Sequence, residues 1–300
     1  MPSQSIPANK ITFTLDLEDN LAKTDFAARY PDTTRQVLDL LDELGTSGTF
    51  FVVGKLARSQ PEFIAEIAAR GHEIAYHSHA HIPLDRDAPN NFRKETEADK
   101  AFIEETTGQP VVGYRAPVWS LVKETVWAVD ALKELGFEYS SSVLPAPNPL
   151  YGFAGAPMEP FYWPNGLLEL PLPLASIGPV TLPFIGGIYL RYLFSPMQGM
   201  VLRRIDRKSV LWTYCHPYDF DPGQVYVRAD GLGFVMSFLL WRNRGGTFRK
   251  MKKLLGNGTA PAFVTRVKSG EFENSIIAEN LTIWSDAYGE REKCRTSLRS

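Results

Sequence analysis

The amino-acid sequence predicts an α/β fold built on a parallel sheet or barrel. Apolar, strand-like runs alternate with helix-like segments from residue 11 to residue 141, and this βαβα repetition implies parallel strands joined by crossover helices. Residues suited to chemistry follow several of the strands, which is where the active residues of a (β/α) barrel lie. The length of 300 residues suits one large domain.

The first half of the chain alternates in regular order. The helix expected over residues 33–44 carries Val37, Leu38 and Leu41 at helical spacing, and Gly45 follows as a stop signal. The run 48–53 is apolar, β-branched and aromatic, as in a buried parallel strand. The predicted strands are 11–17, 48–53, 72–76, 111–114 and 137–141, and the predicted helices are 33–44, 61–69, 91–106 and 123–135.

The second half is less regular. Prolines and glycines are dense from residue 145 to residue 196, which predicts extended strands and loops over the mouth of a barrel. A strand is expected at 209–214, followed by a last helical region made of the apolar run 231–240 and the basic run 242–253. We therefore predict one domain over residues 1–267, including an insertion at 145–200, and a loosely ordered polar tail over 268–300.

Composition and charge narrow the class of protein. The 32 basic and 34 acidic residues give a net charge of −2, so no nucleic-acid partner is expected. The two cysteines, Cys215 in an apolar run and Cys294 in a polar tail, suggest one buried and one exposed thiol rather than a disulfide. Residues 1–10 lack an apolar signal segment and no run of about 18 apolar residues occurs. These features predict a cytoplasmic protein.

A histidine cluster follows the strand at 72–76. Three of the five histidines lie at His77, His79 and His81. Imidazoles four residues apart can hold one divalent metal, so we predict His77 and His81 as ligands, with zinc the default ion and nickel, cobalt or manganese also suitable. The alternation of side chains points His79 the other way, which predicts a structural role for it.

An acidic cluster follows the first strand. A metal-dependent hydrolase needs one carboxylate on the metal and one to act as the base. Asp16 ends the strand and is the predicted base. Glu18 shares the face of Asp16 by the two-residue period, Asp19 follows in the loop, and either could complete the metal site.

Two further residues follow predicted strands. Arg115 precedes Pro117 and could hold a catalytic carboxylate in its ionised form, although a surface arginine is the simpler alternative. His216 follows an apolar strand and precedes a proline, so it could protonate a leaving group. A core histidine with satisfied hydrogen bonds is equally consistent with this position.

Together these motifs resemble the polysaccharide deacetylases of the NodB-homology type, carbohydrate esterase family 4. The resemblance covers roughly residues 11–255 and rests on several short motifs. These motifs are Asp16-Leu17-Glu18-Asp19, the Thr49–Gly54 strand, Gly71-His72-Glu73-Ile74, His77-Ser78-x-x-His81, Arg115-Ala116-Pro117 and, loosely, Leu211 with His216. The form Asp-x-Glu-Asp, with Gly186-Gly187-x-Tyr189-x-Arg191 and His216-Pro217, is similar to the exosortase-associated (PEP-CTERM-type) branch, found in bacterial exopolysaccharide gene sets.

The resemblance implies a distorted (β/α) barrel that removes N-acetyl groups from the sugars of an exopolysaccharide or its precursor. It assigns the base to Asp16, the orientation of that base to Arg115 and the acid to His216. Substrate contacts are expected at Pro117, Trp119, Tyr189 and Arg191. One departure is Ser140, which stands where the branch usually has an aspartate; Asp219, close after His216, could substitute for it.

Two other functions compete with this one. The first is a metal-dependent amidase or deformylase acting on a small or lipid-linked amide. The second is a carbohydrate-binding protein with weak turnover, which the departure at Ser140 favours. The apolar run 234–241 beside a basic segment could also rest on anionic lipid at the inner membrane face, and a core helix with a solvated basic end is its alternative.

Overall fold

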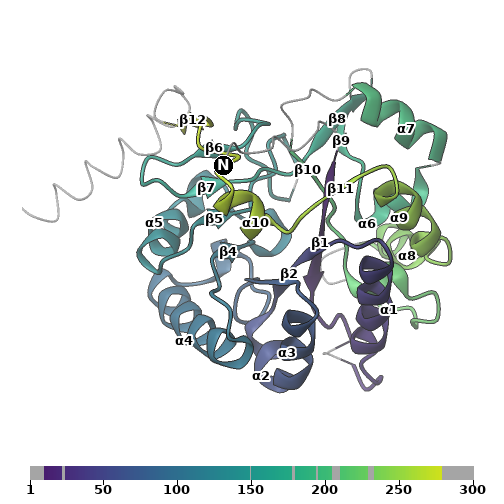
Figure 1. Ribbon diagram of the computed structural model, residues 1–300, viewed down its shortest axis with the longest axis horizontal. Helices are drawn as coiled ribbons and strands as arrows, with labels where there is room; N and C mark the ends of the chain where they lie inside the picture. Colours follow the sequence, from purple (N-terminus) through teal and green to yellow (C-terminus); the bar gives the residue numbers. More distant parts are fainter. Residues whose placement is uncertain are drawn as a thin grey trace, which may run out of the picture.

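Five parallel strands form the centre of one curled sheet in the computed structural model of this chain (Figure 1). The structure describes residues 10–21, 24–148, 150–177, 180–193, 195–204, 210–228 and 233–278. The sheet runs β10-β1-β2-β3-β4-β5-β7-β6-β12. Its first five strands in chain order are β1 (Ile11–Leu17), β2 (Gly48–Val52), β3 (Glu73–Tyr76), β4 (Gly113–Tyr114) and β5 (Tyr139–Ser140). Each pairs in parallel with the next, so the predicted α/β fold with a distorted barrel is confirmed.

The helices of the first half lie on the outside of this curl (Figure 1). They are α1 (Tyr30–Glu43), α2 (Gly54–Ser59), α3 (Pro61–Ala69), α4 (Pro89–Thr107) and α5 (Trp127–Glu134). Short 3₁₀ turns lie between them and later in the chain, namely η1 (Leu84–Arg86), η2 (Pro117–Trp119), η3 (Lys123–Thr125) and η4 (Pro217–Phe220). The helix expected from residue 123 begins at Trp127 instead, because η3 occupies its first turn.

Helix α2 is absent from the sequence-based prediction, since six residues are too short to show a clear helical period. It starts directly after β2 at Gly54. A Cβ atom at this position would lie 1.8 Å from Oδ2 of Asp99, so the position requires glycine for space. The backbone N–H of Gly54 donates to the carbonyl of Ser78 (2.9 Å). The start of α2 is therefore tied to the histidine loop.

The proline- and glycine-rich segment is extended only in its first part. It forms the strands β6 (Phe161–Tyr162), β7 (Leu168–Glu169), β8 (Leu174–Ile177) and β9 (Val180–Pro183), followed by the helices α6 (Gly187–Tyr192) and α7 (Ser195–Arg204). The extended structure predicted to residue 196 is wrong for α6. Residues 188–192 contain no proline, and the helix buries Leu190 and Arg191, so burial of one helical face decides the local structure.

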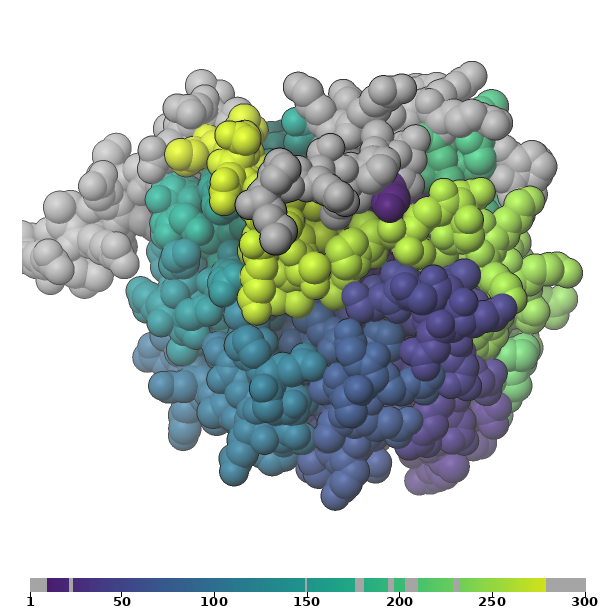
Figure 2. Space-filling view, viewed as in Figure 1, coloured from purple at the N-terminus to yellow at the C-terminus, as the bar shows by residue number. Residues whose placement is uncertain are grey.

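The last strands of the chain include the two edge strands of the sheet, β10 at one end and β12 at the other. The last elements of the chain are β10 (Leu211–Trp212), α8 (Phe234–Trp241), α9 (Thr247–Leu255), β11 (Thr259–Ala260), α10 (Phe263–Lys268) and β12 (Ile276–Ile277). Figure 2 shows the yellow-green residues after 240 packed along purple α1, where Lys252 pairs with Glu43 (2.5 Å). β12 pairs with β6, and Phe272 and Ala278 are buried. The loosely ordered tail is therefore wrong for residues 268–278, while residues 279–300, with Cys294, lie outside the described residues.

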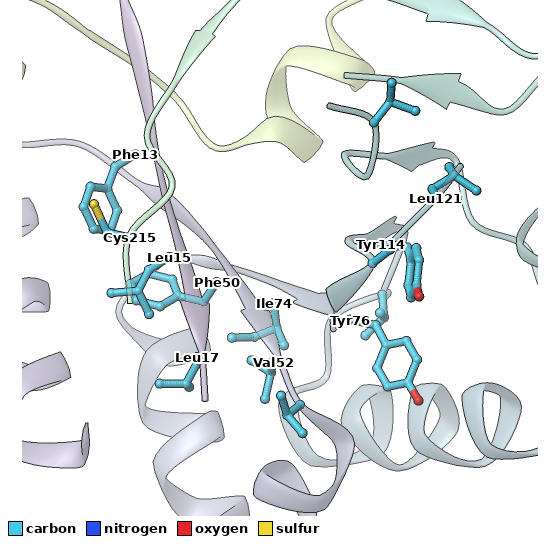
Figure 3. Close-up of a cluster of buried hydrophobic side chains, with 14 of the residues drawn as sticks. Phe13, Leu15, Leu17, Phe50, Val52, Ile74, Tyr76, Tyr114, Leu121 and Cys215 are labelled. Atoms are coloured by element: carbon cyan, nitrogen blue, oxygen red, sulfur yellow. The ribbon is translucent and has the colours of Figure 1, made fainter. Parts of the chain in front are cut away.

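The main core lies between the sheet and its helices. Figure 3 shows alternate residues of β1, among them Phe13 and Leu15, packed beside Phe50 and Cys215. Cys215 is fully buried and unpaired, as predicted. Each large apolar side chain buried in this way contributes about 1.5–3 kcal/mol. The core thus fixes the strands whose ends carry the site.

Candidate active site

The residues of chemical interest converge where three strands end. Asp16 lies near the end of β1 and Glu18 follows it, His77 comes directly after β3, and Arg115 comes directly after β4. His216 follows Cys215, which bridges to Leu15 of β1. Because neighbouring parallel strands end at the same edge, residues far apart in sequence meet there.

Glu18, His77 and His81 form a group suited to a metal ion. Each offers one ligand atom, and these atoms lie within 4.8 Å of one another. Nε2 of His81 is 2.9 Å from Oε2 of Glu18. Two imidazole nitrogens and one carboxylate oxygen are one of the three-ligand sets found in catalytic zinc sites, which leave a position for water or substrate. The residues present therefore fit a divalent cation such as zinc.

Asp19 does not join this group. Its Oδ1 accepts a hydrogen bond from the backbone N–H of Leu21 (2.9 Å), so its carboxylate stabilises the turn after β1. Glu18 supplies the carboxylate instead. Of the two acidic residues left open by the sequence, the structure places only Glu18 beside the histidines, and its role as a ligand stays a prediction.

The orientation of His77 is set by the backbone of Arg115. Nδ1 of His77 lies 2.8 Å from the carbonyl oxygen of Arg115, so Nδ1 carries the proton and Nε2 is left for a ligand bond. His79 points elsewhere, as expected, with Nδ1 2.7 Å from Oδ2 of Asp99 on α4. Asp99 also accepts hydrogen bonds from Arg58 (2.7 Å) and the Tyr76 hydroxyl (3.0 Å). The loop between the two candidate ligands is thereby anchored to α4.

The loops around the site have unusual backbone conformations. Ser78 (φ 62°) and His81 (φ 54°) are left-handed, and so are Val118 (φ 50°) and Trp119 (φ 55°). Left-handed conformations are unfavourable for β-branched and aromatic residues and collect at functional sites. This feature, which no sequence pattern revealed, marks the loops after β3 and β4.

Arg115 holds Asp16 in a buried ion pair. Nη1 of Arg115 donates to Oδ1 of Asp16 (2.5 Å) and to the Thr14 hydroxyl (3.0 Å). Nε and Nη2 donate to the carbonyl and hydroxyl of Ser141 (3.2 and 3.1 Å). The guanidinium also lies over the rings of Phe51 (3.8 Å) and Trp212 (4.4 Å). Arg115 is thus no surface arginine, and its pairing with Asp16 is monodentate.

His216 is held between carboxylates. Its Nε2 lies 3.5 Å from Oε1 of Glu18 and 3.9 Å from Oδ2 of Asp16. Its Nδ1 and its backbone N–H both face Oδ2 of Asp219, at 3.3 and 3.0 Å. Oδ1 of Asp219 is 3.1 Å from Nε of Arg191. Asp219 thus lies beside the candidate acid, as expected of a substitute for the aspartate missing at Ser140.

These contacts shift several pKa values. Burial raises the pKa of Glu18, but the charges of His81 and His216 outweigh it and bring that pKa below its ordinary value. Burial lowers the pKa of His77 to about 4, which keeps it neutral and able to ligate. Burial also acts to lower the pKa of His216, but Glu18 and Asp219 raise it to about 9. His216 therefore carries a proton at neutral pH, as a general acid must.

A cavity of about 620 Å³ opens beside Glu18 and His81. Lys55 and Leu56 of α2 line one side, and Leu240 and Trp241 of α8 line another. Residues around Tyr218 and Arg244 complete its wall. Sequence reasoning missed these wall residues, since α2 was not predicted and α8 begins more than 150 residues after the histidine cluster.

The four predicted substrate contacts do not line this cavity. Arg191 is 1% exposed and donates Nη1 to the carbonyl of Arg242 (2.7 Å) while pairing with Asp219. Arg191 is therefore buried beside Asp219 rather than at the cavity, and its predicted substrate contact has no support in this arrangement. Pro117 is buried, and Trp119 packs edge-on against Tyr214 (5.1 Å). For Pro117, Trp119 and Tyr189 the substrate contact stays a prediction.

Comparison with known families divides the chain in two. Residues 8–140 match the model of the polysaccharide deacetylase family, and residues 141–267 match a domain of unknown function, DUF3473. The boundary falls at β5, inside the curled sheet. The candidate base and the candidate metal ligands lie in the first part. The second part supplies His216 with Asp219 and Arg191 behind it, and the cavity wall around Tyr218 and α8.

Individual relatives support the same family. The chain is 34% identical over 93 residues to a chitooligosaccharide deacetylase of Sinorhizobium fredii, covering 30% of this chain and 43% of that protein. It is 30% identical over 105 residues to the peptidoglycan-N-acetylmuramic acid deacetylase PdaA of Bacillus subtilis, covering 35% and 39%. The matched segment thus spans less than half of each relative.

The fold has a solved counterpart. A crystal structure of a Mycobacterium smegmatis protein described as a polysaccharide deacetylase superposes with a TM-score of 0.60. It covers 92% of this chain and 95% of that chain at 20% sequence identity. At this identity the likeness shows a shared fold, and it extends through both matched parts of the chain.

Proposed function

Because residues 8–140 place this chain in the polysaccharide deacetylase family, we propose that it hydrolyses the N-acetyl amide of amino sugars. One observation carries the proposal: the end of β1 provides two carboxylates in different settings. Glu18 lies with His77 and His81, whereas Asp16 lies outside that group and is held by Arg115. One carboxylate is thus available as a ligand and the other as a base.

The chemistry follows from these positions. A divalent cation held by Glu18, His77 and His81 would polarise the acetyl carbonyl and acidify water. Asp16 accepts a proton from the attacking water as its oxygen bonds to the carbonyl carbon. His216 then donates its Nε2 proton to the sugar nitrogen as the C–N bond breaks, which makes the amine a better leaving group. The products are acetate and the free amino sugar.

The substrate proposed here is an N-acetylated saccharide of a bacterial exopolysaccharide or its precursor. Its support is the exosortase-type motif set around Asp16, Tyr189 and His216. The named relatives are a chitooligosaccharide and a peptidoglycan deacetylase, so both of those glycans belong in the test. The contact between Asp219 and His216 (3.3 Å) supports a deacetylase despite the departure at Ser140, and a protein that only binds sugar is the alternative outcome of the test.

Acetate release from a glycan panel tests the proposal. The panel contains chitooligosaccharides, peptidoglycan and an N-acetylated exopolysaccharide, each with added zinc. We expect release from at least one glycan by the wild type and none by Asp16→Asn, with metal content equal in both proteins. Lack of acetate from every glycan with metal bound would overturn the deacetylase. Loss of metal in Asp16→Asn would make Asp16 a ligand and move the base elsewhere.

A further inference from the structure

Helix α8 exposes apolar side chains and buries its polar one. Its eight residues include one polar side chain, Ser237, and this is the buried one. On the outside, Phe234 is 66% exposed and Val235 71% exposed, and Met236 and Phe238 are exposed as well. A surface helix of a globular protein normally shows polar residues to water. The core helix considered from the sequence is therefore wrong. Phe234 packs edge-on against Tyr226, with ring centres 6.2 Å apart, and its neighbours on this face are exposed.

The inner face of α8 belongs to the candidate active site. Ser237, Leu240 and Trp241 line the cavity that also contains Glu18 and His81. One helix thus separates the cavity from an apolar outer surface. Among the described residues no helix is long and apolar enough to cross a membrane.

The charge around α8 favours an anionic lipid surface over a second copy of the chain. Residues 222–270 contain nine basic residues and one acidic residue, Asp230, although the whole chain has a net charge of −2. The exposed cations on the segments that flank α8 are Arg228, Arg242, Arg249, Lys252 and Lys253, and Lys252 also pairs with Glu43. Arg244 and Arg266 are buried, Arg266 pairs with Glu271, and Lys250 donates to the carbonyls of Leu190 and Arg191. Lys268 lies on α10. A second copy of the chain packed on α8 would bring two positively charged segments together, and these would repel each other. Apolar residues beside cations are the pattern of helices that lie in the membrane interface.

Arg244 gives the cavity wall an unsatisfied positive charge. It is 7% exposed, and within the described part of the chain its Nε and Nη1 have no hydrogen-bond partner. Nη2 donates to the carbonyl of Leu240 (3.1 Å), and the guanidinium lies 5.4 Å from the ring centre of Tyr218. Buried guanidinium N–H groups that lack acceptors are unfavourable. An anionic group in the cavity would supply the missing acceptors, and phosphate matches the guanidinium well.

We propose that α8 rests on a membrane containing anionic lipid and that the substrate is an N-acetylated sugar joined through phosphate to a membrane lipid. The sugar lies at Glu18, His77 and His81, the phosphate contacts Arg244, and the lipid continues into the membrane past the outer face of α8. This inference rests on the proposed deacetylase function for its substrate. Its membrane contact can be measured without any activity.

Vesicle binding tests the role of α8. The full chain is sedimented with phosphatidylcholine vesicles with and without phosphatidylglycerol, at low and high salt. We expect binding that needs phosphatidylglycerol and weakens with salt, and a loss of at least about tenfold in the partition coefficient for Phe234→Ser/Val235→Ser. The matched control is Ile276→Ser/Ile277→Ser on β12, where both residues are 47% exposed, and it should bind as wild type. Circular dichroism checks the fold of each variant.

Three outcomes would overturn the membrane contact. These are no binding by the wild type, equal losses in the two double variants, and a wild-type dimer in sedimentation that the α8 variant abolishes. The last outcome would make a second copy the occupant.

Acetate release tests the substrate. Substrates are a polyprenol-linked N-acetylglucosamine diphosphate in vesicles, the same sugar diphosphate without lipid, and a free chitooligosaccharide. Arg244→Gln should lower kcat/KM for both diphosphates at least about tenfold more than for the chitooligosaccharide. Equal losses on all three would overturn the phosphate contact. Failure of every substrate would instead overturn the deacetylase, and the vesicle result would still decide the role of α8.

Discussion

Arg115 contacts Asp16 through its side chain and His77 through its backbone. Nη1 donates to Oδ1 of Asp16 (2.5 Å), while the carbonyl oxygen of the same residue lies 2.8 Å from Nδ1 of His77. One residue at the end of β4 therefore orients both the candidate base and a candidate ligand. Only the first of these contacts depends on the identity of the side chain, and this difference can be measured.

Replacing Arg115 should separate metal binding from turnover. Arg115→Gln keeps the backbone carbonyl that faces His77, so we expect bound zinc to stay at the wild-type level. Deacetylation should fall steeply, because Asp16 loses its partner. Breaking a buried ion pair costs about 3–5 kcal/mol of unfolding free energy, so thermal unfolding is recorded alongside metal content and acetate release. A variant that folds but has lost its zinc would show that the side chain, not the carbonyl, holds His77.

The histidine loop offers a matched pair of variants. His81→Ala removes a group 2.9 Å from Glu18 and should lose both metal and turnover. His79→Gln lies two residues away, and its contact is with Asp99 on α4, so it should retain metal. Metal content by mass spectrometry measures both proteins. Equal metal loss in the two variants would contradict the assignment of His81 as a ligand.

His216 and Asp219 should act as one unit. His216→Ala should keep its metal and lower kcat by about 10²–10⁴-fold, the usual contribution of a general acid. Asp219→Asn removes a negative charge that raises the pKa of His216. Since the acid must be protonated, activity falls as pH rises through this pKa, and the basic limb of the pH–rate profile should move to lower pH in Asp219→Asn. An unmoved basic limb would assign the acid role to another group.

His72 should make the fold sensitive to acid, independently of the active site. Burial lowers the pKa of His72 to about 4, and its Nδ1 accepts a hydrogen bond from the backbone N–H of Gly48 (3.1 Å). In the unfolded chain His72 becomes protonated near pH 6.5, whereas in the folded chain it stays neutral until the pH approaches 4. The free energy of unfolding therefore falls as pH drops from about 6.5 toward 4, by about 2 kcal/mol at pH 5.

Urea unfolding of wild type and His72→Gln at pH 7.5 and pH 5 measures this effect. Glutamine cannot take up the proton, so the free energy of unfolding of the variant should fall less than that of the wild type between pH 7.5 and pH 5. The other histidines titrate in both proteins and cancel in the comparison. An equal loss in both proteins would mean that His72 is protonated in the folded state.

The sequence alone determined the alternation of strands and helices and the chemistry at the strand ends. Periods of two and 3.6 residues and stop signals such as Gly45 are local properties. They predicted the parallel strands, and parallel strands bring their carboxyl ends to one edge. That rule was enough to bring Asp16, His77 and Arg115 together, although they are up to about 100 residues apart.

Only the tertiary structure showed which of two adjacent candidate residues joins the site and which residues each side chain contacts. Glu18 and Asp19 are adjacent carboxylates, and the hydrogen bond from Leu21 to Asp19 selects Glu18 for the metal group. Arg191 was expected at the substrate, but folding of α6 buries it against Asp219. The segment that forms α8 is consistent with a core helix in the sequence, because hydrophobicity alone does not show whether other parts of the chain cover a helix. Contacts between distant segments settle such questions, and no local pattern encodes them.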